Sequence, residues 1–166
     1  MRNSLTVIVI GLALLLVAMP LPGQAQSAEA LVGTWQYVSG TSTINGKTVP
    51  TFGTNPSGRL VMDRGGNWLA IVTRGDLPKF ASNDRLKGTP EEYKAISDGI
   101  LAYFGKYSVN TAEHMVTVHI LSSSIPNWNG QMQTRKYELA GDTLTITTRA
   151  VDGGVGTIVW KRMAQK

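Results

Sequence analysis

The chain has 166 residues, of which 42% are hydrophobic and 16% are charged, with 18 glycines, no cysteine and a formal net charge of +5. A chain of this length and composition forms a single globular domain and is neither fibrous nor intrinsically disordered. The lack of cysteine excludes disulfide bonds, thiolate metal sites, cysteine nucleophiles and a lipid-modified N-terminal cysteine.

The first 25 residues have the pattern of a secretory signal. Arg2 precedes an apolar run from Leu5 to Met19, and the small residues that end at Ala25 suit a signal-peptidase site. The apolar run is shorter than the roughly 18 to 20 residues that a membrane-spanning helix needs. We therefore expect residues 1–25 to be cleaved and residues 26–166 to form an exported domain, periplasmic or secreted, without a transmembrane span.

The positive charge is spread along the chain. Adjacent basic residues occur only at Arg135-Lys136 and Lys161-Arg162. Domains that bind nucleic acid concentrate their positive charge on one face or along one helix. We therefore expect no nucleic-acid partner.

After residue 26 the sequence consists of short β-type segments separated by turn signals. The low charged fraction and the 18 glycines favour such segments over long, salt-bridged helices. The turn signals are Asn45-Gly46, residues 63–67, Ala140-Gly141-Asp142 and Asp152-Gly153-Gly154. Their regular spacing predicts antiparallel hairpins that form a barrel or a sandwich.

One helix is expected at about residues 89–104. Thr89 suits the N-cap, Pro90 suits the first helical position, and Glu92 completes a capping box with Thr89. Large apolar residues then recur at helical spacing, namely Tyr93, Ile96, Ile100 and Phe104. We expect this apolar stripe to lie against the barrel or to plug one of its mouths.

The alternation of side chains in residues 131–139 indicates which face of that strand is internal. The charged side chains of Lys136 and Glu138 belong outside. The inward-facing residues of this strand are then Gln133, Arg135 and Tyr137. An inward arginine needs an acceptor, which is a backbone carbonyl, a water molecule, or the carboxylate, carbonyl or phosphate of a ligand.

The strand before it contains His119. If residues 122–130 close a symmetric hairpin centred on Asn127, His119 lies opposite Arg135 on the inner wall. A slip of one residue would turn His119 outward. Inside the barrel, His119 would hydrogen-bond a ligand, act as an acid or base, or have only a structural role. Trp128, within the same turn, either lines a cavity mouth or packs on the helix.

Sequence motifs of common enzymes are absent. The chain contains no Gly-x-Ser-x-Gly, no P-loop and no Gly-x-Gly-x-x-Gly. Its two histidines, His114 and His119, are an odd number of residues apart, which places them on opposite faces of one strand. Because this spacing does not suit a histidine metal site, we expect no metal and no cofactor.

A series of short motifs covers nearly the whole chain after residue 26. They are Gly33-Thr34-Trp35, Phe52-Gly53, Asn55-Pro56-x-Gly58, residues 80–93, Tyr103-Phe104-Gly105-x-Tyr107, His119, Pro126-Asn127-Trp128-x-Gly130-Gln131, Arg135, Gly141-Asp142-x-Leu144 and Trp160-Lys161-Arg162. In order and spacing they are similar to the pattern of the bacterial lipocalin-like domain family. The resemblance implies a mainly β, up-and-down antiparallel barrel with one helix, in which Arg162 covers Trp35 as a structural pair. It implies no particular activity, because such barrels host carriers and enzymes alike.

Three functions are compatible with these features. The first is an exported barrel that binds a small, largely hydrophobic molecule with a polar or anionic end. Its candidate ligand-binding residues are His119, Arg135, Tyr137, Trp128, Gln133 and Phe104. The second is an isomerase or cyclase acting on a hydrophobic substrate, with His119 as acid or base and Arg135 stabilising negative charge. The third is a barrel filled by its own side chains that acts through its surface at the cell envelope.

Overall fold

The computed structural model describes residues 27–149 and 153–164. The expected signal at residues 1–25 and Asp152 of the last turn signal lie outside these ranges. The strands are β1 (Gly33–Ile44), β2 (Lys47–Pro50), β3 (Ser57–Met62), β4 (Asn67–Thr73), β5 (Ile100–Asn110), β6 (Met115–Ser123), β7 (Met132–Ala140), β8 (Thr143–Arg149) and β9 (Val155–Arg162). The helices are α1 (Pro90–Gly99) and two short 3-10 segments, η1 (Ala28–Leu31) and η2 (Pro126–Trp128).

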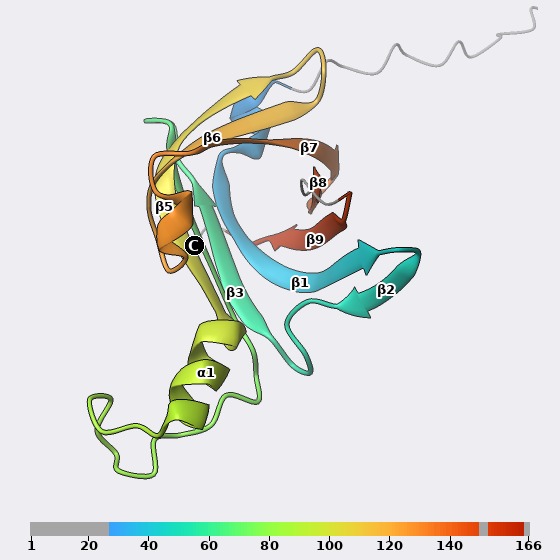
Figure 1. Cartoon of the computed structure of the whole chain (residues 1–166). Coiled ribbons are helices and arrows are strands. Elements are labelled where there is room, and N and C mark those ends of the chain that lie inside the picture. The colour runs from blue at the N-terminus through green and yellow to red at the C-terminus, as the bar shows by residue number, and fades with distance from the viewer. Residues whose placement is uncertain (1–26, 150–152, 165–166) are drawn as a thin grey trace, which may run out of the picture.

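The strands form one antiparallel sheet that closes on itself. Their order is β2-β1-β3-β4-β5-β6-β7-β8-β9, and β1 also pairs with β9. On its other edge, β1 pairs with β3 through residues 33–36 and with β2 through residues 41–44. The β1–β9 ladder therefore closes eight strands into a barrel, from which β2 extends as half of a hairpin (Figure 1). The prediction of a closed antiparallel barrel with one helix is confirmed.

The turn signals within the described ranges lie where strands reverse. Asn45 and Gly46, which connect β1 to β2, both have positive φ angles of 51° and 76°. Asparagine and glycine adopt this conformation at low cost, and such turns match the twist of a hairpin. Residues 63–67 and 140–142 likewise connect β3 to β4 and β7 to β8.

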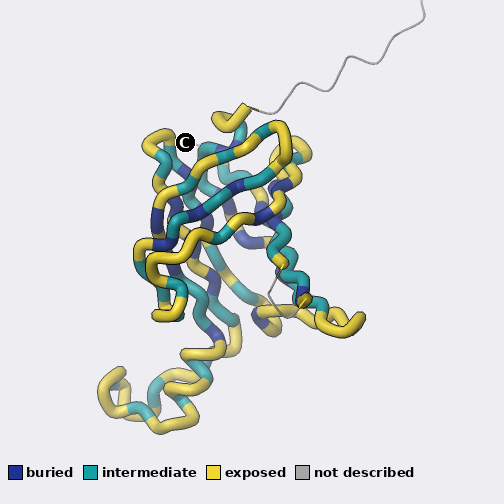
Figure 2. Tube along the Cα trace, turned by 45° about the horizontal axis from the view of Figure 1, so that its top comes forward, coloured by how far each residue is buried: buried dark blue, intermediate teal, exposed yellow. Residues whose placement is uncertain are grey.

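The core is made by the inward-facing residues of the strands. The alternation is clearest on β4 and β6, which bury Trp68, Ala70, Val72, Val116, Val118 and Ile120. Figure 2 shows that the buried positions are concentrated in the barrel, whereas the segment around α1 is exposed or half-buried. None of the helices in the described ranges is long and apolar enough to cross a membrane.

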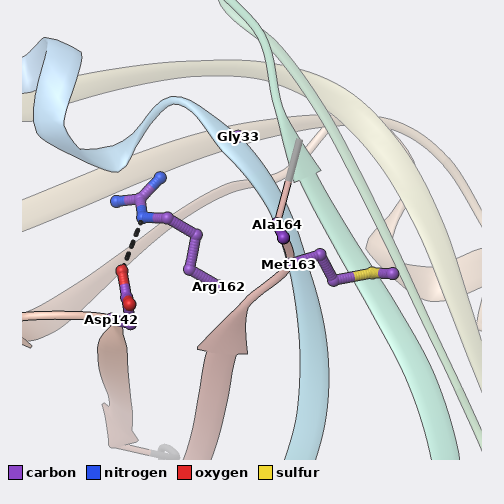
Figure 3. A pocket seen from close by; sticks show the side chains of 5 residues that line it. All are labelled: Gly33, Asp142, Arg162, Met163 and Ala164. Carbon is purple, nitrogen blue, oxygen red and sulfur yellow. Dashed lines mark ion pairs between the residues drawn. The ribbon is translucent and has the colours of Figure 1, made fainter. Parts of the chain in front are cut away.

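One end of the barrel is closed by Trp35 and Arg162. The Arg162 guanidinium lies 4.0 Å from the centre of the buried Trp35 ring. It donates hydrogen bonds to the carbonyl oxygens of Val32 (2.8 Å) and Ala30 (2.6 Å). Its Nε also forms an ion pair with Asp142 at 3.5 Å, across the hollow drawn in Figure 3. All three guanidinium nitrogens thus have a protein partner, so the pair is structural, as the sequence resemblance implied.

Helix α1 begins where the sequence predicts and ends earlier. Thr89 accepts a hydrogen bond from the backbone N–H of Glu92, and the Glu92 carboxylate accepts one from the N–H of Thr89. The helix ends at Gly99, and the chain continues as β5 rather than as helix to Phe104. Ile100 pairs with Thr73, and Phe104 with Leu69. The expected helical stripe was wrong beyond Gly99 because pairing with β4 satisfies the backbone of these β-branched and aromatic residues.

The helix packs chiefly on the loop that precedes it rather than on the barrel. The rings of Tyr93 and Phe80 lie 5.8 Å apart, and the Tyr93 hydroxyl accepts a hydrogen bond from the N–H of Gly88. The Glu92 carboxylate also accepts a hydrogen bond from the N–H of Ala81. Residues 74–99 therefore form a small unit that projects from the mouth end of the barrel (Figure 1). The expectation that the apolar stripe lies against the barrel or plugs one of its mouths was therefore wrong, because the contacts of Tyr93 and Glu92 are made with residues 80–88.

We predict that Arg162→Ala destabilises the fold. The substitution removes two charge-assisted hydrogen bonds to carbonyl groups and the cation–π contact with Trp35. We expect a loss of about 2–4 kcal/mol in the free energy of unfolding, measured by chemical denaturation. The matched control is Lys161→Ala, an exposed position on the same strand, where the change should stay within about 0.5 kcal/mol. Equal effects of the two substitutions would contradict the structural role of Arg162.

Candidate functional site

The barrel is hollow at the end away from Trp35. A cavity of about 730 Å³ opens there, between β1, β4, β5, η2 and strands β7 to β9. Its lining residues are Thr41, Ser42, Thr51, Phe52, Trp68, Leu101, Tyr103, Asn127, Trp128, Gln131, Met132, Gln133, Thr134, Arg135, Ile146, Thr148, Arg149, Gly156, Ile158 and Trp160. An eight-stranded barrel has room either for a packed interior or for one small ligand, and this barrel has the space for a ligand.

Arg135 is the buried cation of this cavity. It lies on the inner face of β7 and is only 5% exposed. Its Nη2 donates a hydrogen bond of 2.5 Å to the Oε1 of Gln133. Its guanidinium carbon lies 5.8 Å from the centre of the Trp68 ring and 5.4 Å from that of Tyr103. Its Nη1 is buried and finds no acceptor among the described residues.

Two further hydrogen-bond donors of the cavity wall are not fully paired. The indole N–H groups of Trp68 and Trp160 are buried, and neither forms a hydrogen bond of good geometry in the part of the chain that the structure describes, although the Trp68 N–H lies close enough to the Tyr103 hydroxyl to lower its pKa. Both residues line the same cavity as Arg135. A buried donor without an acceptor costs about 1–3 kcal/mol, and more when it is charged. The wall of the cavity thus contains buried donors whose hydrogen bonds are incomplete in the described protein.

The two inward arginines of the barrel differ in how they are satisfied. Arg162 has a protein acceptor at each guanidinium nitrogen, whereas within residues 27–149 and 153–164 Arg135 has one side-chain acceptor and an unpaired Nη1. A structural arginine is fully paired because an unpaired buried charge is costly. The Arg135 guanidinium is therefore the one whose hydrogen bonds a further acceptor would complete.

Aromatic side chains form the rest of the site. Tyr103 on β5 contacts Trp128 edge-to-face, with ring centres 6.0 Å apart, so Trp128 lines the cavity rather than packing on the helix. At the rim, Phe52 packs against Tyr37 with a 5.9 Å ring separation. Burial raises the pKa of the Tyr103 hydroxyl, against the lowering effects of the Arg135 charge and of the Trp68 indole N–H. Tyr103 is therefore a neutral phenol at ordinary pH.

The expected pairing of His119 with Arg135 was wrong. His119 lies opposite Met132, and Arg135 lies opposite Val116, which is a shift of three positions. Because side chains alternate along a strand, an odd shift moves His119 to the outer face. The assumption of a symmetric loop failed: the last β6–β7 pair is His119 with Met132, while β6 continues along β5 to Ser123.

The sequence-predicted site residues therefore separate into three groups. Arg135, Gln133 and Trp128 meet in the cavity. Tyr137 is buried in the barrel, but it stacks on His114 at 5.5 Å and does not line the cavity. His119 and Phe104 lie on the outer faces of β6 and β5.

Most lining residues of the cavity were not predicted from the sequence, and among them are the aromatic residues Trp68, Tyr103 and Trp160. The alternation of inward and outward side chains along residues 67–73 and 100–110 indicates that Trp68 and Tyr103 face the interior. It becomes usable only when residues 100–104 are assigned to a strand rather than to a helix. In the described ranges, no cluster of three or more histidine, aspartate or glutamate side chains suits a metal ion.

Comparisons with known proteins find a matching family model, a relative that is named as a carrier protein, and solved β-barrel structures. A family model described as a lipocalin-like domain matches residues 32–163. The 4'-hydroxy-3'-methoxypropiophenone carrier protein ppsC of Aspergillus oryzae is 32% identical over 85 residues, which cover 48% of this chain and 77% of the relative. Among solved structures, a redesigned β-barrel matches with a TM-score of 0.41 and 19% identity over 81% of this chain and 92% of its own. A variant of the fluorescent protein UnaG matches with a TM-score of 0.40 and 14% identity over 84% of this chain and 100% of its own.

We predict that Arg135→Met leaves the unliganded fold as stable as before, or more stable. The substitution removes a buried charge that is only partly paired and keeps a long apolar side chain against Trp68 and Tyr103. Replacing buried ionic groups with apolar ones of similar size is often neutral or stabilising by about 1–4 kcal/mol. Chemical denaturation measures the change. A loss of more than about 2 kcal/mol would show that Arg135 serves the fold and not a ligand.

Proposed function

This chain belongs to the lipocalin-like domain family, and from that membership we propose that it is a carrier of a small, largely hydrophobic molecule with a carbonyl or anionic end. The ligand lies in the cavity, and its acceptor end contacts Arg135. The observation that carries the proposal is the unpaired Nη1 of Arg135, 5% exposed, in the wall of a cavity of about 730 Å³.

The distribution of polar groups sets the orientation of this ligand. The donors of Arg135, Trp68 and Trp160 are deeply buried, whereas Gln131 and Arg149 are exposed at the rim. A carboxylate or carbonyl oxygen placed against the buried donors would take up hydrogen bonds that the protein leaves unmade. The apolar body of the ligand then extends toward the mouth, past the ring of Trp128. We therefore place the polar end of the ligand in the deepest part of the cavity.

The named carrier supports the same class of ligand. The Aspergillus relative is named for a small aromatic ketone, which combines an apolar ring with a carbonyl acceptor. The cavity described here combines aromatic walls with unpaired donors, the complementary features. We infer that an aromatic or aliphatic body with one acceptor group fits this chain, and that Arg135 makes an anionic acceptor the preferred form.

The alternative function, an isomerase or cyclase, lacks its expected acid or base inside the barrel. An isomerase or cyclase mechanism assigned that role to His119, and this residue lies on the outer face of β6. Its imidazole therefore does not face a substrate inside the barrel. Arg135 alone provides a cationic contact and no proton acceptor. The carrier function is the one that the geometry of the cavity favours.

We further propose that the carrier is exported. The support is the sequence of residues 1–25, which combines Arg2, an apolar run and small residues before Gln26. We predict that the protein isolated from its host begins at Gln26, as read by N-terminal sequencing or intact mass. An intact N-terminus in protein taken from the cytoplasm would contradict both cleavage and export.

We predict that Arg135 governs the affinity for an anionic ligand and not for its neutral analogue. A suitable pair of fluorescent probes is 1-anilinonaphthalene-8-sulfonate and N-phenyl-1-naphthylamine, which share the aromatic body and differ by the sulfonate. Arg135→Met should weaken binding of the sulfonate about 10- to 100-fold, because a charge-assisted hydrogen bond is lost. Binding of the neutral probe should remain within about threefold. Fluorescence titration measures both affinities.

The control for this experiment is Arg149→Met, which removes an exposed cation from the rim of the same cavity. It should weaken sulfonate binding by less than about threefold, because an exposed charge is screened. Equal losses in the two variants would mean that net charge attracts the probe, and the assignment to Arg135 would fail. Absence of binding by either probe would contradict the carrier proposal itself.

A further inference from the structure

The outer wall of the barrel carries an apolar patch that the fold leaves uncovered. It consists of Leu69 and Ile71 on β4, Phe104 on β5 and Leu121 on β6, and we call it the outer patch. Each of these side chains is between 39% and 49% exposed. Leu69 and Phe104 are directly opposed in the β4–β5 ladder. A shallow groove of about 380 Å³ lies along the same strands, between the outer patch and residues 122–124.

These positions are the ones where an antiparallel barrel normally has polar residues. On β4, the inward residues Trp68, Ala70 and Val72 are buried, so Leu69 and Ile71 face solvent. A wall with one solvated face normally alternates between apolar and polar residues. Four large apolar side chains on three adjacent strands form a contiguous patch, and such patches mark sites of interaction.

The charged side chains on the strands of the outer patch are positive. Strands β3 to β6 contain no aspartate or glutamate, and their lysine and arginine residues are Arg59 and Lys106. A carboxylate near Lys106 is that of Asp63, in the turn between β3 and β4. Arg59 lies opposite Ile71, and Lys106 lies two residues from Phe104. Their hydrogen bonds go to neutral oxygens, namely the Gly58 carbonyl for Arg59 and the Asn67 side chain and Gly65 carbonyl for Lys106. The outer patch is thus apolar with positive charge at its margins.

We propose that the outer patch docks on a lipid membrane that contains anionic headgroups. Aliphatic and aromatic side chains enter the boundary between headgroups and acyl chains, while flanking lysine and arginine contact the headgroups. The outer patch supplies both components on one face of the barrel. The proposal stands on the exposure of its four apolar residues and on the charges of Arg59 and Lys106, independently of what the cavity binds.

Other occupants fit this surface less well. A second copy packed face to face would bring Arg59 and Lys106 toward cations of the same kind, with no carboxylate on these strands to pair with them. Addition of a β-strand from a partner protein is not available, because β4, β5 and β6 each have strand neighbours on both edges. A lipid surface needs neither a matching carboxylate pattern nor a free strand edge.

The outer patch and the cavity share strand β5. Leu101 and Tyr103 face the cavity, and the alternate residues Ala102 and Phe104 face the groove on the outer wall. Docking therefore brings the wall beside the cavity mouth to the membrane surface. A consequence that rests on the proposed carrier function is that an apolar ligand passes between the membrane and the cavity at this edge.

The test is vesicle co-sedimentation of the purified protein, with the same N-terminus in every variant so that any contribution of residues 1–26 cancels. The vesicles are phosphatidylcholine alone and a 7:3 mixture of phosphatidylcholine and phosphatidylglycerol. We expect the parent protein to bind the anionic vesicles at least tenfold more tightly than the neutral ones. Leu69→Ser with Phe104→Ser should reduce binding to anionic vesicles at least tenfold.

A charge variant and a control define the mechanism. Arg59→Gln with Lys106→Gln should reduce the preference for anionic vesicles about fivefold per cation and leave the weak binding to phosphatidylcholine unchanged. The control is Val38→Ser with Val49→Ser, which removes two apolar side chains of similar exposure (54% and 42%) from β1 and β2, strands that do not contribute to the outer patch. The control should bind anionic vesicles like the parent.

Two outcomes would overturn the proposal. One is binding of the Leu69→Ser, Phe104→Ser variant to anionic vesicles as tightly as the parent. The other is light scattering that shows a dimer which this variant abolishes, together with no vesicle binding by the parent, which would assign the outer patch to a second copy. An unchanged far-ultraviolet circular dichroism spectrum and denaturation midpoint in every variant confirm that the barrel is folded, whether or not the cavity binds a probe. Failure of the carrier proposal alone would leave the vesicle results as predicted.

Discussion

Closure of the sheet by the β1–β9 ladder is the constraint on which the other features of this protein depend. A closed barrel has an inside and an outside, so every strand must divide its residues between them. The same alternation that buries Trp68 and Arg135 leaves Leu69 and Phe104 on the surface. The cavity and the outer patch therefore both result from the alternation of side chains, and they lie on opposite faces of neighbouring strands.

The interior uses its two arginines in different ways because their surroundings supply different numbers of acceptors. At the closed end, the chain before β1 presents backbone carbonyls to Arg162, which then stabilises the fold. In the middle of β7, the backbone groups near Arg135 are used by the sheet, and the side chains around it are mainly aromatic. Ring faces attract a cation but accept no strong hydrogen bond. Gln133 and the rings hold the guanidinium in place, while its Nη1 has no hydrogen-bond acceptor among the described residues.

Signals within a few residues of the sequence predicted local structure correctly. Features that depend on pairing between distant segments were not predicted. Lys136 and Glu138 fixed the inner face of β7, so Arg135 was placed correctly inside the barrel. The capping box at Thr89 placed the start of α1, because both of its hydrogen bonds lie within four residues. The end of α1 depends on pairing of residue 100 with Thr73, which is distant in sequence. The register of His119 depends on an asymmetric loop that contains η2, and alternation within a strand carries no information about that loop.

A carrier that meets its ligand at a membrane gains its selectivity from Arg135 rather than from the apolar wall. Moving an apolar body from acyl chains into a cavity lined by Trp128 and Ile158 exchanges one apolar environment for another. The hydrophobic contribution then largely cancels, because little apolar surface changes its exposure to water. What differs is the polar end, which leaves hydrated headgroups and contacts the Arg135 guanidinium, whose Nη1 has no acceptor among the described residues. Ligands of equal hydrophobicity are therefore distinguished by whether they bring an acceptor to the buried guanidinium, and an anion benefits more than a neutral carbonyl.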